Sequence, residues 1–178
     1  MQLNMYDNAS TGQIIRTIGF YQPFAFLMEH NKIETRWIME GRKPPFKPGK
    51  YLFYSTKNPC TPDMLTKWCG KEIHDRITHF TDASNRSYLN GMGLSIADFK
   101  QYRRMTKDDE ARAFVKFEGR RGWQMEDFSL RYQIQWCIEF ENVQLIEPFP
   151  FIDENGKSLG KQGIGILDKK YHHLIKPL

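Results

Sequence analysis

The chain has 178 residues, of which 26 are Lys or Arg and 21 are Asp or Glu, and 40% of the residues are hydrophobic. This composition excludes a disordered or low-complexity protein, and the length predicts one compact domain over residues 1–178. The mean hydropathy is −0.62 and the longest apolar runs are too short to span a bilayer, so we expect no membrane association. Three cysteines without framework spacing, and a start (MQLNMYDNAS) that lacks a basic and apolar leader, predict a reduced, cytoplasmic location.

The net charge of +5 and the isoelectric point of about 9.1 favour polyanionic partners, chiefly nucleic acid. In the alternative interpretation, a charge of this size only keeps the protein in solution. Charge by itself leaves both interpretations open.

The first third of the chain predicts a strand, a short helix and a second strand. Residues 13–20 (QIIRTIGF) are β-branched and apolar, as in a strand. Pro23 suits a first helical turn, and apolar residues then recur at helical spacing, which predicts a helix over Pro23–His30. KIETRW follows and alternates as a strand does, with Lys32, Glu34 and Arg36 on one face.

The rest of the chain predicts further strands at the end and helices in the middle. After a Pro- and Gly-rich loop, residues 51–56 (YLFYST) predict a strand, and residues 61–69 a helix. Residues 71–90 are ambiguous. Ser95 resembles an N-cap, so we expect another helix from there. Residues 131–149 alternate clearly and predict a long strand. The fold class is therefore α+β, a small mixed β-barrel with helices packed outside.

Signatures of metal or nucleotide binding are weak. Neither a GxxxxGK[ST] nor a GxGxxG motif is present. The residues Cys60, Cys69, His74 and His79 are metal-ligand types, but their spacing does not match the usual pairing of zinc ligands. We expect no metal and no cofactor.

The segment QPFAFLMEHNKIETRW carries the strongest chemical pattern. Lys32, Glu34 and Arg36 would project from one side of a strand, directly after a helix that opens with Gln22. A carboxylate between two cations stays ionised, and such a cluster suits a base edge or a phosphate when it lines a cleft. On a solvated strand face the same residues would form a surface ion pair of little energetic value.

Four motifs in the chain resemble an ASCH domain: QPFA before the first helix, KIETRW, PGKYLFYSTK and, near the end, GKQGIGIL. The resemblance implies a PUA-like β-barrel with a cleft between the first helix and the barrel mouth. It places the barrel core at about 13–57 and 131–178, and a helical, basic insertion at about 58–130.

The resemblance also implies the site residues. The expected ligand-binding side chains are Gln22, Lys32, Glu34, Arg36, Tyr54, Ser55, Lys57 and Gln162. The basic side chains of the insertion would contact a phosphate backbone; these are Arg103, Arg104, Lys107, Arg120 and Arg121.

ASCH domains are associated with RNA, so the predicted function is to bind RNA or another nucleic acid, with one nucleotide or modified base in a polar cleft. The first alternative is a hydrolase of RNA or of a modified nucleoside, similar to the ASCH enzymes that hydrolyse N4-acetylcytidine. Its catalytic residues would be Lys32, Glu34 and Thr35. The second alternative is a protein-interaction adaptor without cleft chemistry.

Overall fold

The computed structural model describes residues 13–81, 85–117, 133–161 and 163–178. The strands are β1 (Ile15–Phe20), β2 (Glu34–Met39), β3 (Lys50–Ser55), β4 (Met92–Arg104), β5 (Gln133–Pro150) and β6 (Ile164–Ile166). The helices are α1 (Phe24–Glu29), α2 (Pro62–Cys69), α3 (Lys71–Thr81) and α4 (Glu110–Ala113). The 3-10 helices are η1 (Asn85–Tyr88), η2 (Lys107–Asp109) and η5 (Lys169–Leu174). The expected α+β class is confirmed.

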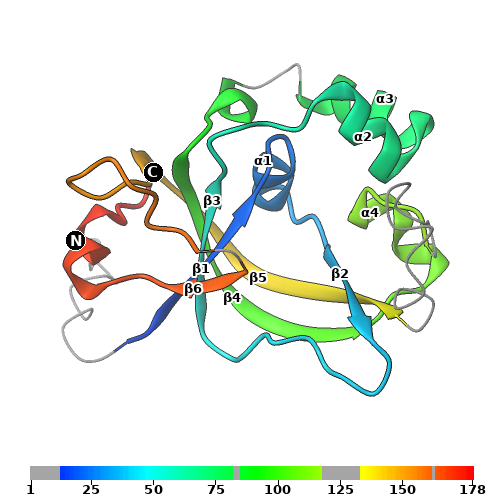
Figure 1. Cartoon of the computed structure of the whole chain (residues 1–178), viewed down its shortest axis with the longest axis horizontal. Helices are drawn as coiled ribbons and strands as arrows, with labels where there is room; N and C mark the ends of the chain where they lie inside the picture. The colour runs from blue at the N-terminus through cyan, green and yellow to red at the C-terminus, as the bar shows by residue number, and fades with distance from the viewer. Residues whose placement is uncertain (1–12, 82–84, 118–132, 162) are drawn as a thin grey trace, which may run out of the picture.

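The six strands form one mixed sheet in the order β2-β5-β4-β3-β1-β6. β1 runs parallel to β3, and the other neighbouring pairs are antiparallel. β4 and β5 have 13 and 18 residues, and their curvature bends the sheet into a half-barrel (Figure 1). α1 lies within the curl of the sheet, so its apolar residues meet the inner face of the strands.

Hydrophobic clusters cover both faces of the central strands. Phe53 of β3 packs in the cluster around α1, whereas its neighbour Leu52 belongs to a second cluster on the other face. The C-terminal segments close this second cluster with Phe151, Leu167 and Ile175. β3 is therefore buried on both faces, which explains why its sequence is a continuous apolar run.

The predicted helix that begins at Ser95 is wrong, because residues Met92–Arg104 form β4. β4 lies between β3 and β5, and Leu94, Ile96 and Ala97 are all buried. A strand covered on both faces lacks alternation, so a local N-cap signal resembled a helix start. The segment 58–130 thus contributes a central strand to the sheet and is not a purely helical insertion.

α2 and α3 form a helical pair beside α1 (Figure 1). The predicted helix at 61–69 is confirmed: the Thr61 hydroxyl accepts a hydrogen bond from the backbone N–H of Met64 at 3.2 Å, and Pro62 occupies the first turn. The ambiguous residues 71–90 contain α3 and η1. No helix in the described ranges is long and apolar enough to cross a membrane.

Candidate functional site

A cavity of about 220 Å³ lies between the end of β1, the start of α1, the edge strand β2 and the segment after α4. Known small-molecule pockets span about 300–1,000 Å³, so this smaller cavity suits one small group, such as the base or sugar of a nucleotide. The lining residues are Gly19, Phe20, Tyr21, Phe24, Lys32, Glu34, Thr35, Arg36, Trp37, Val115, Lys116 and Gln135.

The turn after α1 places the polar residues of the cavity. The backbone N–H of Lys32 donates to the carbonyl of Leu27 at 3.1 Å, which closes the helix. Asn31 takes a left-handed conformation with φ of 64°, which asparagine tolerates better than most residues. The chain then enters β2, where Glu34 pairs with Ile138 and Arg36 with Trp136 of β5. Glu34 and Arg36 of β2 contact each other, as expected for two residues on one strand face, whereas Lys32 precedes the strand.

The side chains of Lys32, Glu34 and Arg36 form a compact ion cluster. The Lys32 Nζ lies 3.2 Å from Glu34 Oε2 and donates to the Ile33 carbonyl at 3.0 Å, while Arg36 Nη1 contacts Glu34 Oε1. The side chains of Lys32 and Glu34 are 3% and 7% exposed, and that of Arg36 is 35% exposed. Two cations around one buried carboxylate leave an excess positive charge at the cavity.

Aromatic side chains form walls of the cavity. The Lys32 Nζ lies 5.5 Å from the centroid of the Phe24 ring, a cation–π distance. Tyr21 is 41% exposed and Trp37 is half-buried, so both rings can be reached from solvent. The sequence predictions had not included Tyr21 and Trp37. Their adjacency to Gln22 and Arg36 along the chain was the available signal.

The segment after α4 supplies the remaining wall. Val115 and Lys116 line the cavity, and the Gln135 side-chain amide of β5 donates to the Lys116 carbonyl at 3.3 Å. The backbone N–H of Ile33 donates to the Arg112 carbonyl at 3.1 Å, which ties the segment to β2. Lys116 adds a third cation, so the lining residues that the structure describes include Lys32, Arg36 and Lys116 and one carboxylate, Glu34. Sequence reasoning missed Lys116 and Gln135, because only the folded chain brings them to β2.

Two predicted site residues, Gln22 and Ser55, lie outside the cavity lining and hold backbone. The Gln22 amide donates to the carbonyls of Arg86 and Leu89 at 3.1 and 3.0 Å and accepts from the N–H of Phe26. The Ser55 hydroxyl donates to the Leu89 carbonyl at 2.6 Å. Both side chains are fully buried and anchor the segment that follows α3.

Tyr54 and Lys57 also lie away from the cavity lining. Tyr54 is 8% exposed and stacks on Phe151 with ring centroids 4.2 Å apart, in the cluster on the other face of the sheet. Burial raises the pKa of its hydroxyl. Lys57 is exposed after β3. Thr35 lines the cavity. Gln162 lies outside the described residues.

Arg103, one of the predicted phosphate contacts, is held by two carboxylates. Its Nη1 and Nη2 donate to Asp109 at 2.8 and 2.6 Å, and its Nε donates to Glu139 at 2.7 Å. The guanidinium of Arg103 holds the pKa of Asp109 well below its usual range. Arg104 and Lys107 are exposed. Arg120 and Arg121 lie outside the described residues.

The cysteines and the possible metal ligands give no second site. Burial raises the pKa of the Cys60 and Cys137 thiols to about 12, so neither forms a nucleophilic thiolate at neutral pH. Among the described residues, no group of three or more His, Cys, Asp or Glu side chains could hold a metal ion.

Comparisons with known proteins find similar solved structures. No family model matches the chain, and no curated protein matches it significantly. The chain is similar to the crystal structure of a mutant of ZmASCH from Zymomonas mobilis, with a TM-score of 0.44 and 11% sequence identity. The similarity covers 89% of this chain and 92% of that one.

Proposed function

We propose that the protein binds nucleic acid, in particular RNA, and that one nucleotide or modified base enters the cavity. The observation that carries this proposal is the buried Lys32–Glu34–Arg36 cluster, which lines a cavity with aromatic walls. Glu34 can accept from the amino group of a base, and Arg36 can donate to a neighbouring carbonyl or a phosphate. The PUA-like, ASCH-type motifs in the sequence agree with this proposal.

The charge and the walls of the cavity define the ligand further. Among the lining residues that the structure describes, three cations and one carboxylate favour an anionic ligand, such as a nucleotide with its phosphate, over a neutral nucleoside. Tyr21 and Trp37 offer aromatic surface on which an unpaired base can stack. Unpaired bases are accessible in single strands, so we infer that the protein prefers single-stranded nucleic acid.

Substitution of Arg36 by Gln tests this proposal. The substitution removes a charged hydrogen-bond donor, which is worth about 1.5–3 kcal/mol, and should weaken binding of a single-stranded RNA dodecamer about ten- to a hundredfold in fluorescence anisotropy. The matched control is Lys169→Gln on η5, which makes the same charge change at an exposed residue. Equal weakening by both variants would show that net charge and not the cavity drives binding.

A hydrolase is the second candidate, because Lys32, Glu34 and Thr35 line the same cavity. In this reaction Glu34 would act as general acid and base, and Lys32 would stabilise the negative charge that develops on a carbonyl oxygen. Incubation with N4-acetylcytidine, followed by chromatography for cytidine, tests the activity. Glu34→Gln should abolish turnover while the protein stays folded by circular dichroism, and absence of cytidine with the wild-type protein would exclude this substrate.

A further inference from the structure

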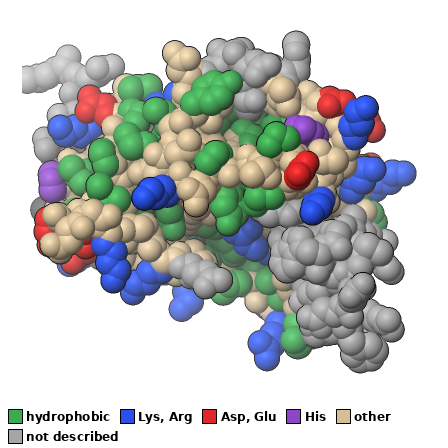
Figure 2. Space-filling model, turned by 45° about the horizontal axis from the view of Figure 1, so that its top comes forward, with side chains coloured by type: hydrophobic (Ala, Val, Ile, Leu, Met, Phe, Trp, Pro, Cys, Tyr) green, Lys and Arg blue, Asp and Glu red, His purple; other side chains and the backbone are tan. Residues whose placement is uncertain are grey.

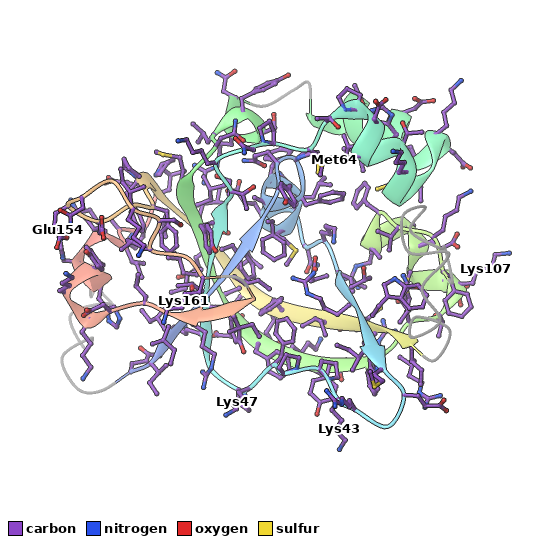
Figure 3. The ribbon with its side chains drawn as sticks, in the orientation of Figure 1. Lys43, Lys47, Met64, Lys107, Glu154 and Lys161 are labelled. Carbon is purple, nitrogen blue, oxygen red and sulfur yellow. The ribbon has the colours of Figure 1, made fainter. Side chains whose placement is uncertain are left out.

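The loop between β2 and β3, residues 40–49, carries a second basic surface that sequence reasoning had not assigned. Arg42, Lys43 and Lys47 are exposed, and none of them forms an ion pair within the part of the chain that the structure describes. The loop has a single acidic residue, Glu40, and the next cation, Lys50 at the start of β3, pairs with Asp98. Lys43 and Lys47 project away from the sheet (Figure 3), and Figure 2 shows Lys and Arg side chains along this lower edge of the molecule.

Buried side chains anchor the second half of the basic loop. Phe46 is 6% exposed and packs beside Tyr51 and Phe140. The Tyr51 hydroxyl donates to the carbonyl of Lys47 and accepts from its N–H, both at 3.0 Å. The Arg16 guanidinium donates to the carbonyl of Pro48 at 3.1 Å. Because these contacts restrain the backbone at Lys47 and Pro48, binding at this part of the loop costs less conformational entropy.

The basic loop continues directly from the cavity. Arg36 and Trp37 line the cavity, and β2 then runs to Met39, about 10 Å from Arg36 at the usual rise per strand residue. The backbone N–H of Arg42 donates to the Met39 carbonyl at 3.0 Å, so Arg42, the first cation of the loop, lies in the turn directly after β2. A chain of phosphates leaving the cavity along β2 would therefore reach the loop within a few nucleotides.

We propose that the basic loop, through Arg42, Lys43 and Lys47, holds the phosphate backbone of a single-stranded nucleic acid whose base occupies the cavity. This inference rests on the proposed function. It assigns the backbone contacts to the loop instead of Arg103, whose guanidinium is occupied by Asp109 and Glu139. Each phosphate contact with a single strand contributes about 0.7 to the slope of log affinity against log salt.

The test compares two triple variants with the same charge change. The first variant replaces Arg42, Lys43 and Lys47 by Gln. The control variant replaces Lys157, Lys169 and Lys176 by Gln; these three are exposed residues of the C-terminal region. The loop variant should lower the salt slope for a single-stranded RNA dodecamer by about 2, because three contacts are lost, and leave binding of the mononucleotide unchanged. The control variant should lower the slope by less.

The outcomes separate this inference from the proposed function. If Arg36→Gln weakens binding of the dodecamer but the loop variant keeps the wild-type slope, the loop inference is overturned and the proposed function stands. If the control changes the slope as much as the loop variant, the loop is not the contact surface. If the loop variant loses binding only to phosphatidylserine vesicles, the loop faces a membrane and the inference is overturned. No binding of the dodecamer by the wild-type protein at low salt overturns both proposals.

Discussion

One ion cluster lies at the start of β2 and another joins β4, η2 and β5, and their charges are arranged in opposite ways. At the cavity, the Glu34 carboxylate lies between two cations, Lys32 and Arg36. At the other cluster, the Arg103 guanidinium lies between two carboxylates, Asp109 and Glu139. The first cluster has excess positive charge beside a cavity, and the second has excess negative charge.

The hydrogen bonds of the two clusters differ as well. Asp109 also accepts from the backbone N–H and the hydroxyl of Thr106, at 2.8 and 2.9 Å, in a capping box at the start of η2. Glu139 accepts from the Gln101 amide at 3.3 Å. The Arg103 cluster therefore joins β4, η2 and β5. One group of charged residues in the sheet thus joins three elements of the fold, whereas the other lines a cavity.

Removal of Glu34 should have the largest effect. Glu34→Ala leaves two neighbouring cations without their carboxylate, and we expect a loss of about 2–4 kcal/mol in the free energy of unfolding, because breaking a buried pair is costly and Arg36 is partly solvated. Urea denaturation measures the loss. The matched double variant Lys32→Met/Glu34→Leu should recover most of the stability, since an apolar pair of similar size replaces the ions. RNA binding should stay impaired in both; unimpaired binding would contradict the role of the cluster.

Removal of the Asp109 charge should have a smaller effect, and on stability alone. Asp109→Asn weakens the two bonds from Arg103, and we expect a loss of about 1.5–3 kcal/mol in the free energy of unfolding. The affinity for the RNA dodecamer should stay within about twofold of wild type, a difference of about 0.4 kcal/mol. A larger loss of affinity would mean that the two clusters are coupled.

The acid dependence of stability sharpens this expectation. The pKa of Asp109 is lowered in the folded protein by Arg103 and by Thr106, against an opposing contribution from burial. Its contribution to stability is complete above the unfolded pKa of about 3.9 and is lost as the pH falls through the lower folded pKa. The wild-type protein should therefore lose more stability than Asp109→Asn between about pH 5 and pH 2 in urea denaturation. Parallel pH profiles would contradict the assignment.

Much of the fold follows from local patterns, and so does one half of the site. The alternation in KIETRW predicts the shared face of Glu34 and Arg36, and the structure confirms it. The error at Ser95 has a physical cause, because β4 is buried on both faces and its sequence lacks the period of an amphipathic strand. The other half of the cavity was unpredictable, because Lys116 and Gln135 are distant in sequence from β2.

Two polar side chains show the same limit of prediction from the sequence. Gln22 and Ser55 follow a binding-site pattern in the sequence, but their side chains bond to the backbone of residues 86–92. A polar side chain has the same hydrogen-bonding groups for a ligand as for backbone. Only its partners in the folded chain separate these two roles.

The sequence by itself determines the α+β class, most of the strands and helices, and the charged face of β2, because these depend on side-chain periods over a few residues. The tertiary structure decides which charged side chains pair with one another and which line the cavity. Glu139, 36 residues from Arg103, occupies its guanidinium, whereas Lys116, 80 residues from Arg36, joins it at the cavity. Such pairings arise from strand order and curvature, which no short segment of the chain specifies.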